Sequence, residues 1–327
     1  MKKLIVFFAI ISILFGCSKT ETYKNSNKDS DIEIAIVSNA LVPFWVPMGK
    51  GMEDAGEKLG VKVSWKGPEN SQLSEQLRII ENYVSKGVNG IAISPINQES
   101  LVPIINSIVE KGIVVLTMDS DAPESKRFAY IGTDNYNAGK QAGKTMLKVL
   151  PGGGKVAVFV GNLSAQNAID RLQGFRDSVK GSNIEIVKVY LDDADKGRSR
   201  SNVENALQKY KDIKGLLGLY SYNAPSIADA VIASDLAGKV KIVGFDAEPA
   251  TLIHLENNVI DAAIVQKPYY FGYLSVQIIY NIIKMGSEST GILLPKNRII
   301  DTGVETITPE NAKDYKNRLK ELGVESS

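Results

Sequence analysis

Short runs of apolar, mostly β-branched residues alternate with helical patterns along the first third of the chain. Residues 32–37 form one such run, and helical spacing of apolar residues follows from about 44 to 59. This sequence of patterns predicts a strand and then a helix. The unit recurs, with strands expected at 61–65, 90–93 and 114–117 and helices at 73–85 and 101–111. Repeated units of this kind predict a parallel sheet with helices on both faces.

The same rhythm restarts after Tyr130 and Ile131. A helix is expected near 137–150, and strands are expected at 156–160, 186–190, 216–220, 240–245 and 262–265. The second half therefore repeats the architecture of the first. We expect an α/β protein with two similar Rossmann-like, parallel-sheet domains, because the roughly 295 residues after residue 31 are enough for two separate cores.

The first seventeen residues have the features of an export signal. Lys2 and Lys3 give a positive start, residues 4–15 form an apolar run with Ser12 as its one polar residue, and the run closes on Leu-Phe-Gly-Cys at Cys17. We interpret residues 1–16 as a signal peptide and the closing segment as a lipobox. The alternative is a transmembrane anchor, which needs about 20 apolar residues, whereas this run has 12.

Cys17 is the only cysteine of the chain, so an internal disulfide is impossible. Diacylglyceryl attachment at Cys17 is the favoured interpretation over a catalytic thiol beside a cleavage site. Residues 17–31, rich in Ser, Lys, Asn and Asp, are expected to be a lipidated tether. Without Lys2 and Lys3, the 38 basic residues become 36 against 37 acidic ones, a formal charge near −1. This balance gives no attraction for nucleic acid.

Polar side chains follow most of the expected strands. Ligands of open parallel sheets bind outside the carboxyl ends of the strands, so these positions are candidates for a binding site. They are Ser38, Asn39, Ser94, Asp119, Ser120, Asp121, Asn162, Asp192, Asp193, residues 220–223, Asp246 and Gln266. A catalytic metal site would need His or Cys clusters, and the sole histidine, His254, lies in an expected helix as an ordinary residue. We expect no metal.

Two further segments have structural interpretations. Residues 152–154 are three glycines, but they follow a helix and precede a strand, whereas a dinucleotide-binding loop follows a strand and opens a helix. We expect a plain turn there and no cofactor. Thr308 and Pro309 resemble an N-cap followed by proline at the first helical position, so residues 308–327 are expected to be a C-terminal surface helix.

Aromatic residues stand in the first strand-to-helix loop. Phe44 and Trp45 directly follow Pro43. Sugars and polyols present apolar C–H faces and rings of hydroxyls, so a receptor for them needs aromatic plates together with polar side chains such as Asp, Asn, Arg and Gln. The chain supplies both kinds. The alternative for Trp45 is that it packs the helix start against the core.

Seven short segments resemble the ribose-binding family of periplasmic sugar-binding proteins in their order and spacing. They are Pro43-Phe44-Trp45, Ile93-Ser94-Pro95, Met118-Asp119, Tyr130-Ile131-Gly132-Thr133-Asp134-Asn135, Arg171-Leu172-Gln173-Gly174-Phe175, Val243-Gly244-Phe245-Asp246 and Val265-Gln266. The likeness runs from about residue 32 to 298 and implies the type I periplasmic binding protein fold. The ligand domains of LacI-type repressors share this fold, but a repressor would begin with a DNA-binding helix pair where this chain has the export signal.

The resemblance implies which side chains contact the ligand. They are Phe44, Trp45 and Asp119 in the first domain and Arg171, Asn223, Asp246 and Gln266 in the second domain and hinge. A carboxylate accepts from two neighbouring hydroxyls while an arginine donates to a third oxygen. The alternative for these polar residues is a helix cap or an interdomain ion pair.

The chain departs from the ribose-binding pattern at several positions. Members that bind ribose have arginine at Ser120, asparagines at Val42 and Ser94, and an aromatic residue at Ala194. The hypothesis is therefore that the ligand is not ribose in its usual pose but a polyol, a deoxy sugar or a larger sugar. Replacement contacts are expected from Asp121, Glu248, Tyr220 or Tyr222.

The family pattern also implies a hinge of three crossings, near 133–134, 265–266 and 297–298. The expected domains are then 32–133 plus 267–297 and 134–266 plus 298–307. The implied mechanism is closure of the two domains around the ligand.

The implied function is that of a binding protein that delivers a sugar or polyol to an ABC-type permease. We expect a monomer, exported and lipid-anchored in the periplasm or at the cell surface, and no enzyme, because no nucleophile–base pair is visible. Two alternatives stay open. One is a sugar-sensing receptor for chemotaxis or signalling, and the other is a secreted carbohydrate-active enzyme that uses Asp192 and Asp193 as paired carboxylates.

Overall fold

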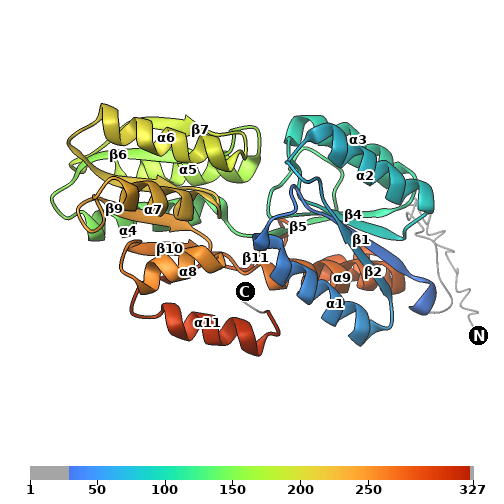
Figure 1. Cartoon of the computed structure of the whole chain (residues 1–327). Helices are drawn as coiled ribbons and strands as arrows, with labels where there is room; N and C mark the ends of the chain where they lie inside the picture. Colours follow the sequence, from blue (N-terminus) through green and yellow to red (C-terminus); the bar gives the residue numbers. More distant parts are fainter. Residues whose placement is uncertain (1–28, 325–327) are drawn as a thin grey trace, which may run out of the picture.

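Two α/β domains lie side by side in the computed structural model, which describes residues 29–324 (Figure 1). Their central strands are apolar along most of their length because helices bury parallel strands on both faces. In the first sheet the strands are β1 (Glu33–Val37), β2 (Lys62–Lys66), β3 (Gly90–Ile93), β4 (Val114–Met118), β5 (Ala129–Gly132) and β11 (Ile299–Asp301). In the second they are β6 (Gly154–Val160), β7 (Ile184–Leu191), β8 (Ile213–Gly218), β9 (Lys241–Phe245), β10 (Ala262–Val265) and β12 (Glu305–Ile307).

Both sheets have the same strand order. The first reads β11-β5-β4-β3-β1-β2 and the second β12-β10-β9-β8-β6-β7, so β1 to β5 correspond to β6 to β10. Among the strand pairs of the described residues, β10–β12 is the one antiparallel pair. The prediction of two similar parallel-sheet α/β domains is confirmed.

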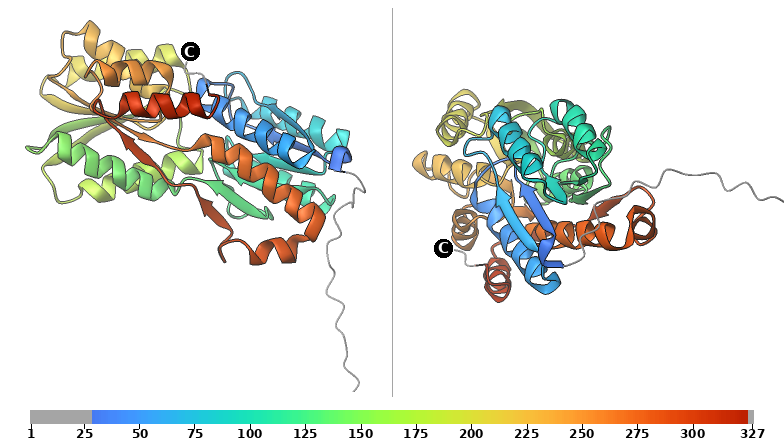
Figure 2. Two further views of the ribbon diagram at one scale, coloured as in Figure 1. Left: turned by 90° about the horizontal axis from the view of Figure 1, so that it is seen from below. Right: turned by 90° about the vertical axis from the view of Figure 1, so that its right-hand side faces the viewer.

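Helices cover both faces of each sheet (Figures 1 and 2). In the first domain, α1 (Val46–Leu59) and α9 (Pro268–Met285) pack on one face and α2 (Leu73–Lys86) and α3 (Gln98–Glu110) on the other, while α10 (Ser287–Ile292) follows α9. In the second, α4 (Asn135–Val149) and α5 (Gln166–Val179) cover one face and α6 (Lys196–Lys209), α7 (Asn223–Ala233) and α8 (Pro249–Glu256) the other. Each domain thus has a core on either side of its sheet.

Helices α4 and α5 pack with their backbones in close approach. A Cβ on Gly139 would lie 2.1 Å from the carbonyl oxygen of Arg171, and one on Gly174 would lie 2.0 Å from that of Tyr136. Only glycine permits such contact. The two glycines therefore let α4 and α5 pack at this short distance, and this packing sets the position of α5 and of Arg171 on it.

The chain passes between the domains three times, between β5 and α4, between β10 and α9, and between β11 and β12. The third passage differs from the one expected near 297–298. Ile299 and Ile300 pair with Tyr130 and Ile131, so residues 299–301, expected in the second domain, belong to the first sheet. A three-residue strand carries no pattern that distinguishes the two sheets, and pairing with β5 decides its place.

The ends of the fold also differ from expectation. Asp29–Asp31, expected at the end of the tether, form a 3-10 turn (η1), and Asp29 Oδ1 lies 2.7 Å from Lys284 Nζ. The expected signal peptide, Cys17 and residues 18–28 lie outside the described residues. At the other end, the expected surface helix begins at Ala312 rather than after Thr308, and α11 (Ala312–Glu321) packs buried Ala312 and partly buried Leu319 against the second-domain core. Residues 325–327 are not described.

No helix between residues 29 and 324 has the length and apolar character that crossing a bilayer requires.

Candidate functional site

The carboxyl ends of the two sheets face a chamber between the domains. It encloses about 800 Å³ of empty space, which includes solvent at its mouth, and small-molecule sites span roughly 300–1,000 Å³. Loops after β1, β4, β8, β9 and β10 and the start of α5 line it. The polar and aromatic residues on its wall are Asn39, Phe44, Trp45, Glu69, Asn70, Ser71, Asp119, Asn162, Asn167, Arg171, Lys196, Tyr220, Ser221, Tyr222, Asp246 and Gln266.

Asp119 and Asp246 occupy equivalent positions in the two domains. Each directly follows its strand, β4 or β9, with left-handed backbone at φ of 59° and 64°, a conformation that Asp tolerates better than most residues. Their N–H groups donate to the carbonyl oxygens of Ile131 (3.1 Å) and Ile264 (2.9 Å) on the neighbouring strands. This shared geometry brings both carboxylates to the chamber wall from opposite sides.

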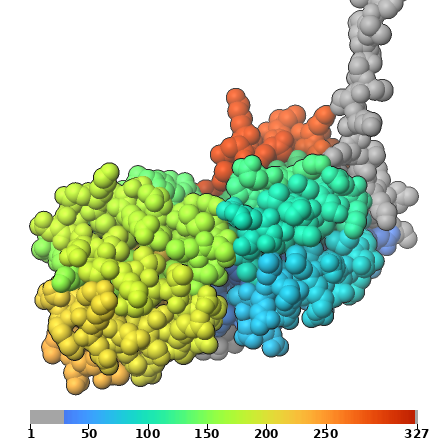
Figure 3. All heavy atoms as spheres, turned by 90° about the horizontal axis from the view of Figure 1, so that it is seen from above, coloured from blue at the N-terminus to red at the C-terminus, as the bar shows by residue number. Residues whose placement is uncertain are grey.

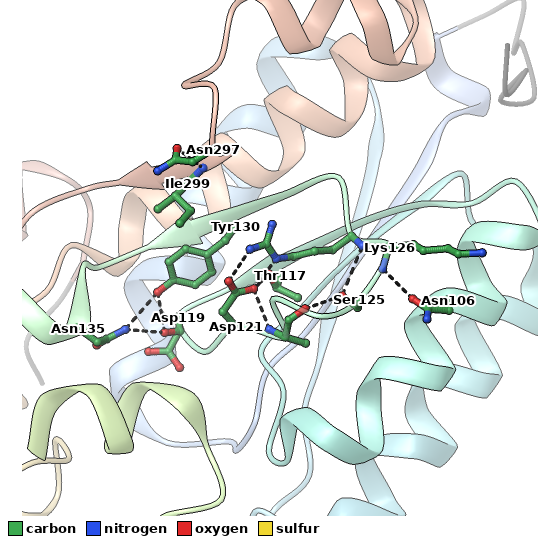
Figure 4. Close-up of polar contacts among 12 residues, drawn as sticks. Asn106, Thr117, Asp119, Asp121, Ser125, Lys126, Tyr130, Asn135, Asn297 and Ile299 are labelled. Atoms are coloured by element: carbon green, nitrogen blue, oxygen red, sulfur yellow. Dashed lines mark hydrogen bonds and ion pairs between the residues drawn. The ribbon is translucent and has the colours of Figure 1, made fainter. Parts of the chain in front are cut away.

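The Asp119 carboxylate is held by side chains from both domains. Its Oδ2 accepts from Ser94 Oγ (2.9 Å) and from Asn167 Nδ2 (3.2 Å). Its carbonyl oxygen accepts from the Tyr130 hydroxyl (2.9 Å) and from Asn135 Nδ2 (3.3 Å), as Figure 4 shows. Within residues 29–324, Oδ1 accepts no hydrogen bond, so this oxygen is left for a further partner.

Burial raises the pKa of both carboxyl groups. For Asp119, desolvation raises the pKa, and the charge of Arg171 opposes the rise. For Asp246, desolvation raises the pKa to about 6, opposed by Arg171 and by hydrogen bonds from Gln266. A carboxylate with a raised pKa has lost more stabilisation from water than its hydrogen-bond donors in the protein replace. Both groups therefore favour added hydrogen-bond donors.

Arg171 lies buried between these carboxylates and its own domain. Its Nε donates to Asn135 Oδ1 (2.8 Å) and its Nη1 to the Leu219 carbonyl oxygen (2.9 Å). The guanidinium carbon lies 4.5 Å from the centre of the Phe245 ring, a stacking that suits its flat, weakly hydrated cation. These contacts fix the plane of the side chain, and the remaining Nη2 has no partner among the described residues.

Three polar atoms from chamber-wall residues are buried without a hydrogen bond among the described residues. They are Arg171 Nη2, Asn167 Oδ1 and Gln266 Oε1. A buried polar atom without a partner costs about 1–3 kcal/mol. One donor and two acceptors of this kind indicate a wall built to receive a polar molecule.

Aromatic rings flank the polar wall. Phe44 and Trp45, in the 3-10 turn η2 (Pro43–Trp45), meet edge to face with centres 5.0 Å apart. Trp45 is 1% exposed and its Nε1 donates to Asn39 Oδ1 (3.2 Å). The ring belongs to the first-domain core, as the alternative expected, and it also lines the chamber. Its contact with a ligand stays a prediction.

Three serines expected in the site lie behind the wall rather than on it. Ser38 Oγ accepts from Trp65 Nε1 (3.0 Å), and Ser94 Oγ donates to Asp119. Ser120 is fully buried. Ser38 and Ser120 are absent from the chamber wall, whereas their neighbours Asn39 and Asp119 line it.

Asn223 is a structural residue in the second domain. Its Nδ2 donates to Asp192 Oδ2 (2.9 Å), and its Oδ1 accepts from the Tyr220 N–H (3.0 Å). It starts α7, where the unpaired backbone groups of a helix end are met locally. Its amide is therefore engaged within its own domain and is absent from the chamber wall.

Two wall amides differ in how far the sequence indicated them. Asn39, a strand-end candidate, lines the chamber, whereas Asn167 was not among the candidates. Asn167 lies one helical turn before Arg171 on α5, so the i, i+4 spacing puts both on one face. That spacing was the signal that the sequence contained for Asn167.

The expected replacement contacts divide into two groups. Tyr220 and Tyr222 line the chamber, with ring centres 6.1 Å apart. Asp121 is bound by Arg127 through two hydrogen bonds and accepts from Thr117 Oγ1 (2.6 Å; Figure 4). Glu248 accepts from Ser221 Oγ (2.6 Å). Both acids are thus satisfied away from the chamber.

Between residues 29 and 324, no group of three His, Cys, Asp or Glu side chains has the arrangement of a metal site.

Residues 34–288 match the family described as periplasmic binding protein domain. The chain belongs to this family. The match covers most of both domains, and it confirms the resemblance found in the seven sequence segments. Periplasmic binding protein domains act outside the cytoplasm.

Relatives of this periplasmic binding protein domain have sugar-binding names. The solved ABC transporter solute binding protein of Burkholderia graminis, in complex with D-arabinose, is 34% identical, covers 89% of this chain and 99% of its own, and gives a TM-score of 0.83. The xylose/arabinose-binding protein of Sulfolobus acidocaldarius is 26% identical over 84% of this chain and 70% of its own length. The D-allose-binding periplasmic protein of Escherichia coli is 28% identical over 83% and 90%.

Proposed function

We propose that the chain is the extracytoplasmic binding protein of an ABC-type sugar transporter and that it closes around one monosaccharide or polyol. The relatives named for arabinose, xylose and allose support this class of ligand. The observation that carries the proposal is the chamber wall, which combines buried atoms without partners, two carboxylates and two aromatic side chains from the first domain.

Each feature of the wall suits a part of a small sugar. Asp119 Oδ1 and the Asp246 carboxylate accept from hydroxyls, and Arg171 Nη2 donates to a ring or hydroxyl oxygen. Phe44 and Trp45 offer apolar surface to the C–H face. A hydrogen bond from Arg171 Nη2 to the ligand would satisfy an atom that is otherwise buried without a partner. Binding would then remove the free-energy cost of that unpaired atom.

Closure follows from the placement of these groups on both domains. Asp119 lies on the first, Arg171 and Asp246 on the second, and Gln266 at the passage from β10 to α9. A ligand that touches both sides favours the closed arrangement by its difference in affinity for the two states. The three passages between the domains serve as the hinge.

The first-domain wall favours a ligand with fewer polar contacts than ribose. Val42 and Ala40 line the chamber there, while the Ser94 hydroxyl donates its hydrogen bond to Asp119. We infer a deoxy sugar, a polyol or a larger sugar, with an apolar portion directed at this side.

Binding without turnover is the inferred outcome. The sequence left open an enzyme that uses Asp192 and Asp193, but Asp192 is buried against Tyr222 (2.5 Å) and Asn223, and Asp193 pairs with Arg198 on the surface. A glycosidase needs two carboxylates facing one bond. The two side chains serve different contacts and do not form such a pair.

The anchor and the assembly complete the proposal. Diacylglyceryl at Cys17 would hold the receptor, as a monomer, beside the membrane permease that accepts its ligand. A scattering mass independent of concentration tests the monomer. Mass spectrometry of the N-terminal peptide tests the lipid.

A thermal-shift screen of the full chain in mild detergent tests the function. The candidates are pentoses, hexoses, deoxy sugars, polyols, cyclitols and nucleosides. A ligand present at 100 times its dissociation constant adds about 2.7 kcal/mol of stability. We expect one sugar or polyol to raise the melting temperature, Asp246→Ala to abolish the shift, and the control Asp193→Ala, an exposed acid outside the chamber, to keep it. A shift with nucleosides alone, or with none of these compounds, contradicts the proposal.

A further inference from the structure

The two most exposed large apolar side chains of residues 29–324 are neighbours. Ile292 is 84% exposed and Leu293 69%, at the end of α10, and Met285, 47% exposed, is the last residue of α9, two residues before α10 begins. Figure 2 shows α10 projecting from the first domain, and Figure 3 shows the orange segment standing out at its edge. Single exposed hydrophobic residues are ordinary, but a contiguous group marks an interaction surface. We call these three residues the α10 patch.

Sugar binding does not account for the α10 patch. Helix α9 starts two residues after Gln266, on the chamber wall, and ends at Met285. Its 18 residues span about 27 Å. The patch therefore lies at the opposite end of the first domain from the chamber, where no ligand held by Asp119 or Arg171 reaches it.

The described chain begins beside the α10 patch. Asp29 Oδ1 lies 2.7 Å from Nζ of Lys284, the residue before Met285. Cys17 precedes Asp29 by 12 residues, and a chain of that length spans at most about 40 Å. A bilayer that holds a lipid on Cys17 therefore lies within this distance of Lys284, next to the patch.

The charges around the α10 patch suit a bilayer surface. Lys284 and Lys296, both exposed, flank it in the sequence, and Glu288 is the one acidic residue between them. Lys284 pairs with Asp29, so Lys296 is the flanking lysine without an ion pair among residues 29–324. Apolar side chains flanked by lysines lie at the boundary between headgroups and acyl chains, and the lysines add attraction to anionic lipids. A bilayer offers acyl chains to the apolar side chains and phosphates to the lysines, whereas a sugar or a soluble protein does not offer both.

We propose that the α10 patch rests in the headgroup region of the bilayer that carries the anchor. This inference depends on the proposed lipid at Cys17. A single lipid anchor lets the receptor turn freely, whereas a second contact at α10 fixes which side of the first domain faces the membrane. The receptor then presents its chamber to the permease from a restricted set of orientations.

Fluorescence quenching in vesicles tests the contact. The full lipidated chain is reconstituted into vesicles of phosphatidylethanolamine and phosphatidylglycerol with brominated acyl chains. Cys17 is the only native cysteine, and the proposed diacylglyceryl group would block its sulfur as a thioether, so Ser289→Cys in α10 would take an environment-sensitive label alone. Ser234→Cys, exposed in the second domain, is the matched label control. We expect quenching and a blue shift at position 289 and neither at position 234.

Substitutions separate the patch from the anchor. The double variant Ile292→Asn, Leu293→Asn is expected to float with the vesicles, to melt as the parent does, and to lose the quenching at position 289. Ile253→Asn, 51% exposed in the second domain, is expected to keep it. Cys17→Ser is expected to abolish flotation.

The experiments distinguish failure of the lipid anchor from failure of the patch contact. A parent chain that does not float overturns the lipid anchor and with it the membrane contact. A chain that floats but shows equal quenching at both labels, or a double variant that keeps the quenching, overturns the patch contact alone. Concentration-dependent shielding of the label at position 289 in detergent, without vesicles, would show that a second copy covers the patch and would also overturn the proposal.

Discussion

The protonation of Asp246 is expected to make both the stability of the fold and the affinity for the sugar depend on pH. Burial raises its pKa from the ordinary 3.8 to about 6, and the charged groups that face it are Arg171 and Asp119. Because the folded-state pKa is the higher one, the folded chain resists ionisation, and stability falls as the pH rises from about 4 to 6. A rise of about two pKa units corresponds to about 3 kcal/mol at pH 7. Asp246→Asn removes the charge and suits the left-handed φ of 64°, so this variant is expected to be more stable at pH 7 by up to this amount, and unchanged at pH 4.

The same substitution is expected to weaken sugar binding. An ionised carboxylate accepts from two hydroxyls, so the ligand competes with the proton on Asp246. Lowering the pH from 7 to 5 reduces the ionised fraction, and with it the affinity, about tenfold for a pKa near 6. Asp246→Asn is expected to bind more weakly at pH 7 and to lose most of this pH dependence.

Urea unfolding at pH 4 and pH 7 measures the stability, and calorimetric titration between pH 5 and 7 with the sugar found by thermal shift measures the affinity. Asp193→Asn is the control, because that exposed carboxylate pairs with Arg198 outside the chamber. The reasoning is refuted by an Asp246→Asn chain that is less stable at pH 7, or by one that keeps the parent affinity and pH dependence.

Three further predictions concern the chamber and the core. Arg171→Lys loses the flat stacking on Phe245 and is expected to weaken sugar binding about 10- to 100-fold by calorimetry. The control Arg176→Lys, on the exposed face of α5, is expected to leave the affinity unchanged. Equal affinities of the two variants would contradict the role assigned to Arg171. Trp65→Phe leaves Trp45 as the one tryptophan, and its emission is expected to shift on sugar binding; an unchanged spectrum at saturation places the ligand away from that ring. Phe175 lies on the buried face of α5, and Phe175→Ala is expected to cost about 3–5 kcal/mol in urea unfolding; a loss near zero contradicts the packing described.

Most of the architecture was readable from local patterns. Runs such as residues 90–93 are apolar throughout because both faces of a parallel strand are covered, and this signal predicted nine of the strands, but not β5, β11 or β12. The short strand Ile299–Asp301 was placed in the wrong domain, since three residues are consistent with either sheet edge. Its pairing with Tyr130 and Ile131 is a long-range contact that no local pattern records.

The candidate site was predicted in outline and corrected in detail. Strand-end position found Asp119 and Asp246, because topology brings the carboxyl ends of parallel strands together. Strand-end position did not distinguish adjacent residues, so Ser38 and Ser120 were included although they lie behind the chamber wall. Asn167 was missed because its role depends on α5 lying against the first domain, where its Nδ2 meets Asp119.

By itself, the sequence determined that this protein alternates strands and helices in two similar halves and that its polar residues gather after the strands, because periodicity and turn chemistry are local properties. Only the tertiary structure decided which of those polar atoms are engaged and which are not. Asp121 is satisfied by Arg127, whereas Arg171 Nη2 and Gln266 Oε1 are buried without a partner. Hydrogen bonding and desolvation depend on neighbours distant in sequence, so the pKa of Asp246 and the shape of the chamber exist only once the two domains meet.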